Sequence, residues 1–324
     1  MRESRRARSI PPGGTLGIAA PSGPVDPERL AVGAAGLRER GFEVVHSEDI
    51  VAQRGYLAGN DERRAQELMD LIRNPGIDGI ICARGGYGCQ RILPLLDPEV
   101  IRSEAKPLVG YSDVTALLSW QERCAGLVGL HGPMLERSEG LGSETLEALE
   151  RALLGTDEGA RLKGNGRVAG VADGPLRGGS LTMMVTSLGT PWEIETQNAI
   201  VLLEEVNEPP YRVDRMLQQL STAGKLDGAA VGLGVGGLVG CEDRRYPRPD
   251  AEEVISEILE PLGLPMVTGL SFGHTDDNWT WPYGGLARID GEGGEIVLVE
   301  ASTERRAEEA AAAAGSESRA RSGS

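Results

Sequence analysis

The chain has 324 residues, of which 40% are hydrophobic and 25% charged, the ordinary composition of a globular protein of about two domains. Its formal net charge of −16 argues against nucleic acid or an anionic membrane as a partner, because phosphate groups are bound by clustered lysine and arginine. With only three histidines in the chain, a His-rich metal site is not expected.

The N-terminal end of the chain is basic, and no apolar run of signal-peptide length follows it. No stretch approaches the ~20 apolar residues of a membrane span. The four cysteines lie in apolar or glycine-rich settings typical of buried free thiols, which fits a reducing compartment. We therefore expect a cytoplasmic protein, in which residues 1–14 form a loose lead-in.

In residues 13–150, strand-like and helix-like segments alternate with short connections. The strand-like runs are 15–20, 42–45, 79–83, 108–110 and 126–130, and the helix-like segments are 28–40, 61–72, 89–96 and 113–123. This alternation predicts an α/β domain with a mostly parallel sheet and helices on both faces. Ligands bind such sheets at the carboxyl ends of the strands, where Ser22, the Gly85-Gly86 pair, Ser112 and His131 are expected.

The second half of the chain has more strand and less helix. We read residues 151–166 as a linker, 167–302 as a smaller α+β, barrel-like domain, and 303–324 as a disordered tail. Strands are expected near 167–172, 200–203, 229–239 and 265–269, with helices at 179–188, 211–220 and 251–262. A closing hairpin is expected from residues 287–289 and 295–299.

Ser112 follows a predicted strand and precedes a predicted helix, in Gly110-Tyr111-Ser112-Asp113-Val114. A serine at such a corner can be a nucleophile held on a tight turn. The usual pattern G-x-S-x-G is incomplete, because Val114 occupies the place of the second glycine. A Ser-Asp pair before an apolar run is also a common helix N-cap, so both interpretations stay open from this stretch alone.

A serine nucleophile needs a base and an acid that orients the base. His131 and His274 both follow strands and lie next to glycines, whereas His46 is expected in a surface loop. Glu204 and Glu205 end an apolar strand, and only one of them can face a given site because adjacent strand residues point to opposite sides.

The loop from Arg84 to Gly88, Arg-Gly-Gly-Tyr-Gly, offers backbone N–H groups for a phosphate or for an oxyanion. The G-x-x-x-x-G-K-[ST] pattern is absent, and so is G-x-G-x-x-G after the first strand, which argues against nucleotide binding.

Five stretches, in the same order along the chain, resemble the LD-carboxypeptidase family of serine peptidases, which includes muramoyl-tetrapeptide carboxypeptidases and microcin C self-immunity proteins. They are Ala19-Ala20-Pro21-Ser22-Gly23, Arg84-Gly85-Gly86-Tyr87-Gly88, Gly110-Tyr111-Ser112-Asp113-Val114-Thr115, the run from Leu203 to Arg215, and Gly273-His274. The resemblance covers about residues 13–300 and implies a Rossmann- or flavodoxin-like N-terminal domain. It further implies a homodimer.

By this resemblance Ser112 is the nucleophile, His274 the base and Glu204 the orienting acid, with the backbone N–H groups of Gly86 and Asp113 as the oxyanion hole. The nucleophile then lies on the first domain, and the other two residues lie on the second. The implied activity is cleavage of the amide before the terminal D-Ala of a murein tetrapeptide during cell-wall recycling. The resemblance implies no metal and no organic cofactor.

Two other functions stay open, and so does the role of three aromatic residues. The close alternative is a hydrolase of aminoacyl or peptidyl nucleotides like the microcin-resistance members, and the more distant one is a non-catalytic binding protein. Trp279, Trp281 and Tyr283, where family members are usually aliphatic, can either line the pocket and stack on a substrate ring or pack the seam between domains.

Overall fold

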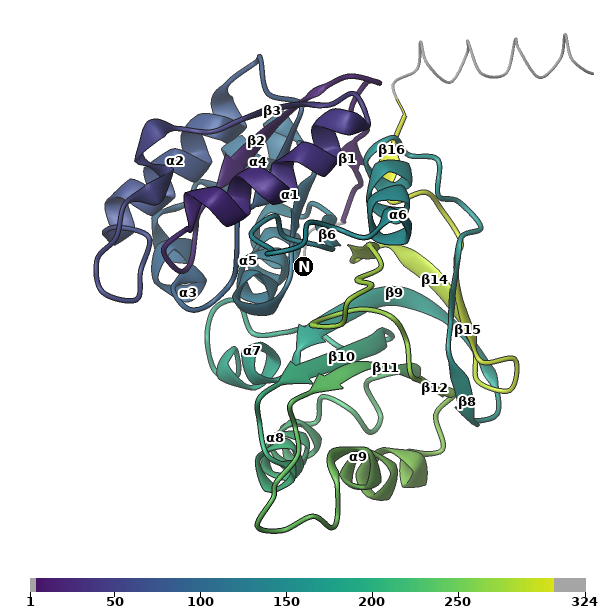
Figure 1. The fold of residues 1–324 in the computed structure, drawn as a ribbon. Helices are drawn as coiled ribbons and strands as arrows, with labels where there is room; N and C mark the ends of the chain where they lie inside the picture. The colour runs from purple at the N-terminus through teal and green to yellow at the C-terminus, as the bar shows by residue number, and fades with distance from the viewer. Residues whose placement is uncertain (1–3, 306–324) are drawn as a thin grey trace, which may run out of the picture.

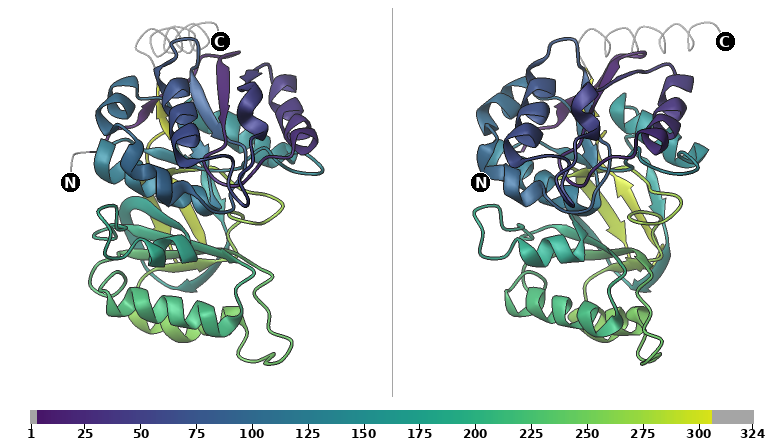
Figure 2. Two further views of the ribbon diagram at one scale, coloured as in Figure 1. Left: turned by 90° about the vertical axis from the view of Figure 1, so that its left-hand side faces the viewer. Right: turned by 60° about the vertical axis from the view of Figure 1, so that its left-hand side comes forward.

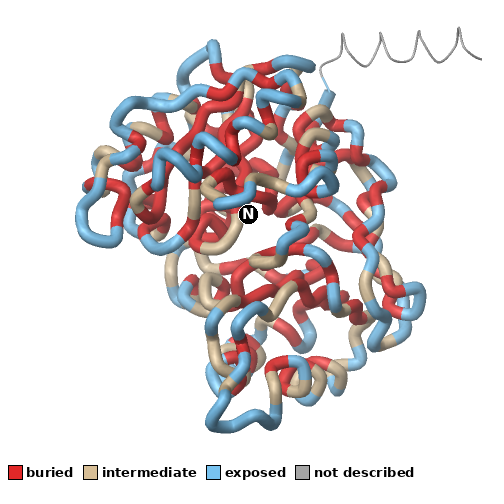
Figure 3. Tube along the Cα trace, viewed as in Figure 1, coloured by how far each residue is buried: buried red, intermediate tan, exposed pale blue. Residues whose placement is uncertain are grey.

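The computed structural model of the protein describes residues 4–305, which form two α/β domains, one above the other in Figure 1. The N-terminal sheet is mostly parallel, as the sequence predicts, and the C-terminal sheet is mixed. Buried residues follow the strands of both sheets, and exposed residues lie on the outer helices and loops (Figure 3). Among residues 4–305, no helix is both long and apolar enough to cross a membrane.

Within residues 4–305, the N-terminal sheet has six strands in the order β13-β6-β5-β4-β2-β3, of which β13 (Trp281–Tyr283) comes from the C-terminal half. Five of them are parallel and come from the N-terminal half: β2 (Thr15–Ala19), β3 (Glu43–Val45), β4 (Gly79–Cys82), β5 (Leu108–Gly110) and β6 (Gly129–His131). These strands are short, largely buried apolar runs, as expected where helices cover both faces.

Helices cover both faces of this sheet. On one face, α1 (Pro27–Glu39) and α6 (Ser143–Leu153) share a core with β2 and β6. The other face packs against α2 (Asp61–Arg73), α3 (Cys89–Ile92), α4 (Pro98–Glu104) and α5 (Thr115–Trp120). The short helical turns of this half are η1 (Glu48–Val51), η2 (Leu93–Leu95), η3 (Ser112–Val114) and η4 (Gln121–Ala125). The helix α4 was not predicted.

In the part of the chain that the structure describes, the C-terminal sheet has eight strands in the order β7-β15-β14-β9-β10-β11-β12-β8. They are β7 (Arg161–Lys163), β8 (Asn165–Val168), β9 (Val171–Ser180), β10 (Ile200–Val206), β11 (Gly232–Val239), β12 (Met266–Thr268), β14 (Leu286–Asp290) and β15 (Glu295–Leu298). The last two form the predicted closing hairpin. Because β7 and β8 are the two edge strands yet only Gly164 separates them in the chain, the sheet curls until its edges meet, in the barrel-like manner expected.

Helices cover the side of this sheet that faces away from the N-terminal domain. The helices α8 (Pro210–Thr222) and α9 (Ala251–Leu259) lie together below the strands in both turned views (Figure 2). The short α7 (Leu181–Thr186) and the turn η5 (Glu260–Leu262) complete the helical elements of this half.

The two domains share one strand and one hydrophobic core. β13 (Trp281–Tyr283) comes from the C-terminal half but pairs antiparallel with β6 at the edge of the N-terminal sheet. Trp281 and Tyr283 are fully buried there, so they pack the seam and do not line a substrate pocket. Trp279 is only partly buried against the same core. A buried ion pair also crosses the seam, from Arg177 Nη2 on β9 to Glu122 Oε1 at 2.7 Å.

Three segments differ from the prediction. The expected linker, residues 151–166, holds the end of α6, the strand β7 and the start of β8. In the expected lead-in, β1 (Ala7–Arg8) pairs in parallel with β16 (Thr303–Glu304), the first two residues of the expected tail. Both ends of the described chain are therefore held by backbone hydrogen bonds, and residues 306–324 of the predicted tail lie outside the described residues.

Candidate active site

Ser112 sits where β5 turns sharply into the helical segment η3–α5. Its φ of +60° lies in the left-handed region, which a non-glycine residue adopts only when its surroundings enforce it. Gly85 allows this turn, because a Cβ on Gly85 would lie 3.0 Å from both Cβ and Oγ of Ser112. The side chain does not cap η3 or α5, for which no side-chain cap is formed, so the N-cap interpretation is wrong.

The Ser112 hydroxyl instead meets an imidazole from the other domain. Its Oγ lies 3.2 Å from Nε2 of His274, and Nδ1 of His274 lies 2.7 Å from Oε2 of Glu204. Glu204 lies on β10 and is fully buried, whereas the side chain of His274 is 19% exposed in the loop after β12. The structure thus brings together the three residues that the sequence singled out.

Glu205 faces the opposite side of β10, as alternation along a strand requires. Its Oε2 accepts a hydrogen bond from the backbone N–H of Thr182 at 2.7 Å, and burial raises its pKa. Of the two glutamates that the sequence left open, Glu204 alone reaches the histidine.

The loop that carries His274 is held tightly against β10. Gly273 has a φ of +93°, and a Cβ on this residue would lie 2.5 Å from Oε2 of Glu204. The Gly273 N–H donates to Oδ1 of the buried Asn278 at 3.0 Å. Glycine is therefore required here, both for the backbone conformation and for the approach of the glutamate.

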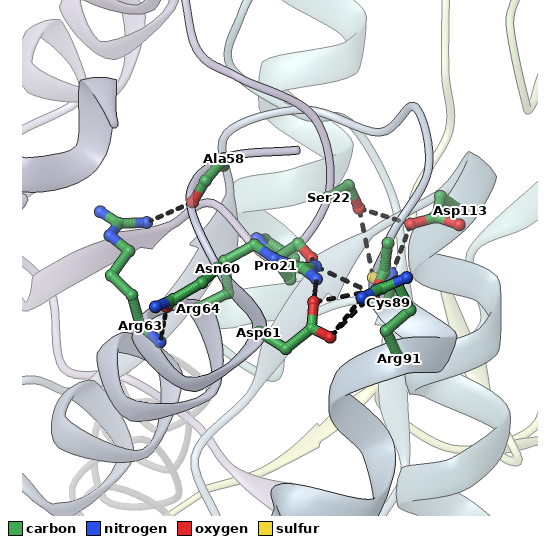
Figure 4. Close-up of polar contacts among 11 residues, drawn as sticks. Pro21, Ser22, Ala58, Asn60, Asp61, Arg63, Arg64, Cys89, Arg91 and Asp113 are labelled. Carbon is green, nitrogen blue, oxygen red and sulfur yellow. Dashed lines mark hydrogen bonds and ion pairs between the residues drawn. The ribbon is translucent and has the colours of Figure 1, made fainter. Parts of the chain in front are cut away.

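Asp113 ties together the three loops at the carboxyl ends of β2, β4 and β5 (Figure 4). Its Oδ2 accepts hydrogen bonds from the Ser22 hydroxyl at 2.7 Å and from the Cys89 N–H at 2.8 Å. The fully buried Arg64 donates to the carbonyl oxygens of Pro21 and Gly88 in the same region. Burial raises the pKa of Asp113, while these donors oppose the rise. The side chain of Asp113 thus anchors the turn that carries Ser112.

The predicted oxyanion donors, Gly86 and Asp113, belong to these anchored loops. Gly86 has a φ of +115°, which glycine alone adopts freely, and it lines the same cavity as Ser112. Their role as donors remains a prediction.

The cavity above Ser112 has a volume of about 220 Å³ and is rich in arginine. It is lined by Arg29, Arg84, Gly85, Gly86, Tyr111, Ser112, Met134, Glu136, Arg137 and His274. A second cavity of about 540 Å³ shares Arg84 and Gly86 with it and exposes Tyr56 and Tyr87, whose rings meet edge to face at 5.8 Å.

Sequence reasoning missed the roles of Tyr56, Glu136 and Arg137 in these cavities. They occur in loops without hydrophobic periodicity, so no pattern in the chain singled them out. Arg84 and Tyr87 lay within a motif that the sequence did single out.

The other candidate histidines lie away from this cavity. His131 is fully buried, and its ring stacks on Trp281 with the centroids 4.6 Å apart. Burial lowers its pKa to about 3, so it stays neutral. His46 is exposed and contacts the carbonyl oxygen of Ser47, as expected for a surface loop. Of the four thiols, those of Cys82, Cys89 and Cys241 are buried, and that of Cys124 is half-buried.

Serine hydrolases typically contain a serine, a histidine and a carboxylate that are hydrogen-bonded in series. Ser112, His274 and the buried Glu204 have this arrangement between the two α/β domains. The LD-carboxypeptidase N-terminal domain model matches residues 16–132, and the C-terminal domain model matches residues 173–289. The chain therefore belongs to the LD-carboxypeptidase family of serine peptidases.

Individual relatives cover nearly the whole chain. A putative carboxypeptidase of Synechocystis sp. is 38% identical over 90% of this chain and 96% of its own. The muramoyltetrapeptide carboxypeptidase of Oxalobacter formigenes has a similar structure, with a TM-score of 0.79 and 32% identity over 88% of this chain and 97% of its own. MccF in complex with glutamyl sulfamoyl guanosine shares the fold, with a TM-score of 0.84 at 24% identity over 92% of this chain and 99% of its own.

Proposed function

We propose that the protein is a serine LD-carboxypeptidase that removes the terminal D-Ala from murein tetrapeptide in the cytoplasm, during cell-wall recycling. The hydrogen-bonded series from Ser112 through His274 to Glu204, opening into a small cationic cavity, is the observation that carries this proposal. The similarity to a muramoyltetrapeptide carboxypeptidase supports the substrate class. A homodimer is part of the proposal and is tested by light scattering on the purified protein.

In the proposed reaction, Oγ of Ser112 attacks the carbonyl carbon of the scissile amide while Nε2 of His274 takes the hydroxyl proton. Glu204 holds the imidazole by its Nδ1–H and stabilises the imidazolium that forms. The backbone N–H groups of Gly86 and Asp113 donate to the oxyanion. His274 then gives its proton to the leaving amine of D-Ala, and the acyl group stays on Oγ of Ser112. Water attacks this ester while His274 takes a proton from it, and His274 returns the proton to Oγ of Ser112 as the acyl group leaves.

The test is incubation with L-Ala-γ-D-Glu-diaminopimelate-D-Ala, with release of D-Ala followed by mass spectrometry. Wild type should release D-Ala, and Ser112→Ala should leave only a trace of the rate, because the attacking oxygen is removed. Wild type that releases no D-Ala would contradict the proposal.

A second candidate substrate is an aminoacyl nucleotide, and the cavity that exposes Tyr56 and Tyr87 favours it. Two tyrosine rings beside the catalytic cavity can stack on a nucleobase. Cleavage of an aminoacyl sulfamoyl adenylate by wild type, without release of D-Ala from the tetrapeptide, would establish this alternative.

A further inference from the structure

Arg137 differs from the other two arginines of the catalytic cavity, because among residues 4–305 it has no acidic partner within 4 Å. Nη1 of Arg84 lies 3.2 Å from Oε1 of Glu136, and Nη1 of Arg29 lies 4.0 Å from the same oxygen. Of the carboxylates in residues 4–305, none forms an ion pair within 4 Å of the Arg137 guanidinium, so its positive charge is not balanced locally. One carboxylate among three guanidinium groups leaves the cavity with an excess of positive charge.

The guanidinium of Arg137 is nevertheless fixed in position, beside the catalytic histidine. Its Nη1 donates to the carbonyl oxygen of Asp276 at 3.3 Å, and its Nη2 donates to that of Thr275 at 3.5 Å. Both carbonyls directly follow His274 in the chain. The field of Arg137 also reaches Tyr111, the residue before Ser112, where it opposes the rise in the phenol pKa that burial causes.

These bonds leave part of the guanidinium free to bind a ligand. The group carries five N–H bonds in a planar fork, and the two carbonyls take one from each terminal nitrogen. The remaining N–H bonds match the two oxygens of a carboxylate, which arginine binds with two parallel hydrogen bonds. The cavity of about 220 Å³ that Arg137 lines together with Ser112 can therefore bind a small anionic group beside the serine.

We propose that Arg137 binds the free carboxylate of the substrate's C-terminal residue and so restricts cleavage to the last amide bond. This inference rests on the proposed carboxypeptidase function and names the residue that selects the chain end. Arg137 is thereby a specificity-determining residue that contacts the leaving residue, while the attack on the amide depends on Ser112, His274 and Glu204.

The experiment compares two substrates that differ in one group, the tetrapeptide with a free terminal carboxylate and the same peptide as its C-terminal amide. Wild type should prefer the acid by roughly 10²-fold in kcat/KM, the usual effect of one hydrogen-bonded charge pair. Arg137→Met should reduce this preference to less than about threefold, through a higher KM for the acid and little change for the amide. Arg137→Lys should keep roughly a tenth of the preference, because an ammonium lacks the planar fork.

Arg29→Met is the matched comparison, because Arg29 lines the same cavity but its guanidinium lies within 4.0 Å of the Glu136 carboxylate. This variant should affect the acid and the amide alike and keep the preference. Labelling of Ser112 by an uncharged fluorophosphonate ester reports whether each variant still folds around a working nucleophile. If Arg137→Met is not labelled, it does not fold correctly, and the inference is tested by whether Arg137→Lys loses most of the preference for the acid over the amide.

Three results would overturn the inference while leaving the proposed function intact: a wild type that cleaves acid and amide equally, an Arg137 variant that keeps the full preference, or a preference that is lost with Arg29→Met. A wild type that is labelled at Ser112 but releases neither D-alanine nor D-alaninamide would instead contradict the proposed function itself.

Discussion

Gly273 is the position where the smallest change should disconnect Glu204 from His274. A Cβ added there would lie 2.5 Å from Oε2, 2.6 Å from Cγ and 2.7 Å from Cβ of Glu204. All three distances are well inside ordinary van der Waals contact, and Glu204 is fully buried, so its side chain has no solvent to move into. Alanine at Gly273 should therefore push the carboxylate away from Nδ1 of His274.

Two terms set the expected loss of stability in Gly273→Ala. The φ of +93° is unfavourable for any residue with a Cβ and costs about 1–2 kcal/mol. Overpacking against Glu204 adds about 1–3 kcal/mol. Gly41→Ala is the matched control, because its φ of +89° imposes the first term while nothing lies within 4 Å of its added Cβ. The two variants should differ by the overpacking term alone.

Activity should separate the two variants more strongly than stability does. Losing the acid that orients the base lowers kcat by roughly 10²–10⁴-fold in serine hydrolases, so we expect a loss in this range for Gly273→Ala and none for Gly41→Ala. Urea unfolding gives the stabilities, and the rates of D-Ala release and of fluorophosphonate labelling at Ser112 give the activities. A Gly273→Ala enzyme within about threefold of wild type in both rates would refute this reasoning, as would an equal loss in Gly41→Ala.

Three further predictions concern the seam and the neighbouring cavity. Burial holds the pKa of His131 at about 3, against 6.5 in the unfolded chain, so the unfolded state takes up a proton as the pH falls below 6.5. The free energy of unfolding should therefore fall by about 2 kcal/mol between pH 7 and pH 5 through His131, and His131→Phe should remove this component from urea curves; equal pH slopes would contradict it. Arg177→Met leaves the buried carboxylate of Glu122 without its cation and should lower the free energy of unfolding by about 3–5 kcal/mol. The double variant with Glu122→Met should recover much of this loss, and a double variant no more stable than Arg177→Met would show that the unpaired carboxylate is not the cause. Tyr56→Ala should slow cleavage of an aminoacyl sulfamoyl adenylate by roughly tenfold, measured beside the murein tetrapeptide, and an equal loss on both substrates would rule out base stacking.

The sequence predicts the parallel sheet of the first half well, because its strands are continuous apolar runs bounded by glycine, proline and helix caps. The predicted strand at residues 79–83, for example, agrees with β4 (Gly79–Cys82) to one residue. The placement of Glu204 and His274 beside Ser112 came from a resemblance to a family, since no local pattern reports contacts between residues so far apart in the chain.

What the sequence could not predict depends on tertiary contacts. The strand β13 is only three residues long and contains a proline, so its pattern does not identify a strand until β6 lies beside it. The same is true of β1 and β16, which have two residues each and are strands only because they pair with one another. Arg137 lies in a polar loop, and only its position in the folded chain relates it to His274.

The strand exchange at β13 affects how the protein is made. The sheet that carries Ser112 lacks its edge strand until residues 281–283 have been synthesised, so the open edge of β6 stays unpaired while most of the second domain emerges from the ribosome. Long-range pairing of this kind forms slowly, since a large loop must close before the contact is gained. The N-terminal domain therefore does not complete its sheet first and independently, and a chain truncated before Trp281 is exposed to aggregation at that edge.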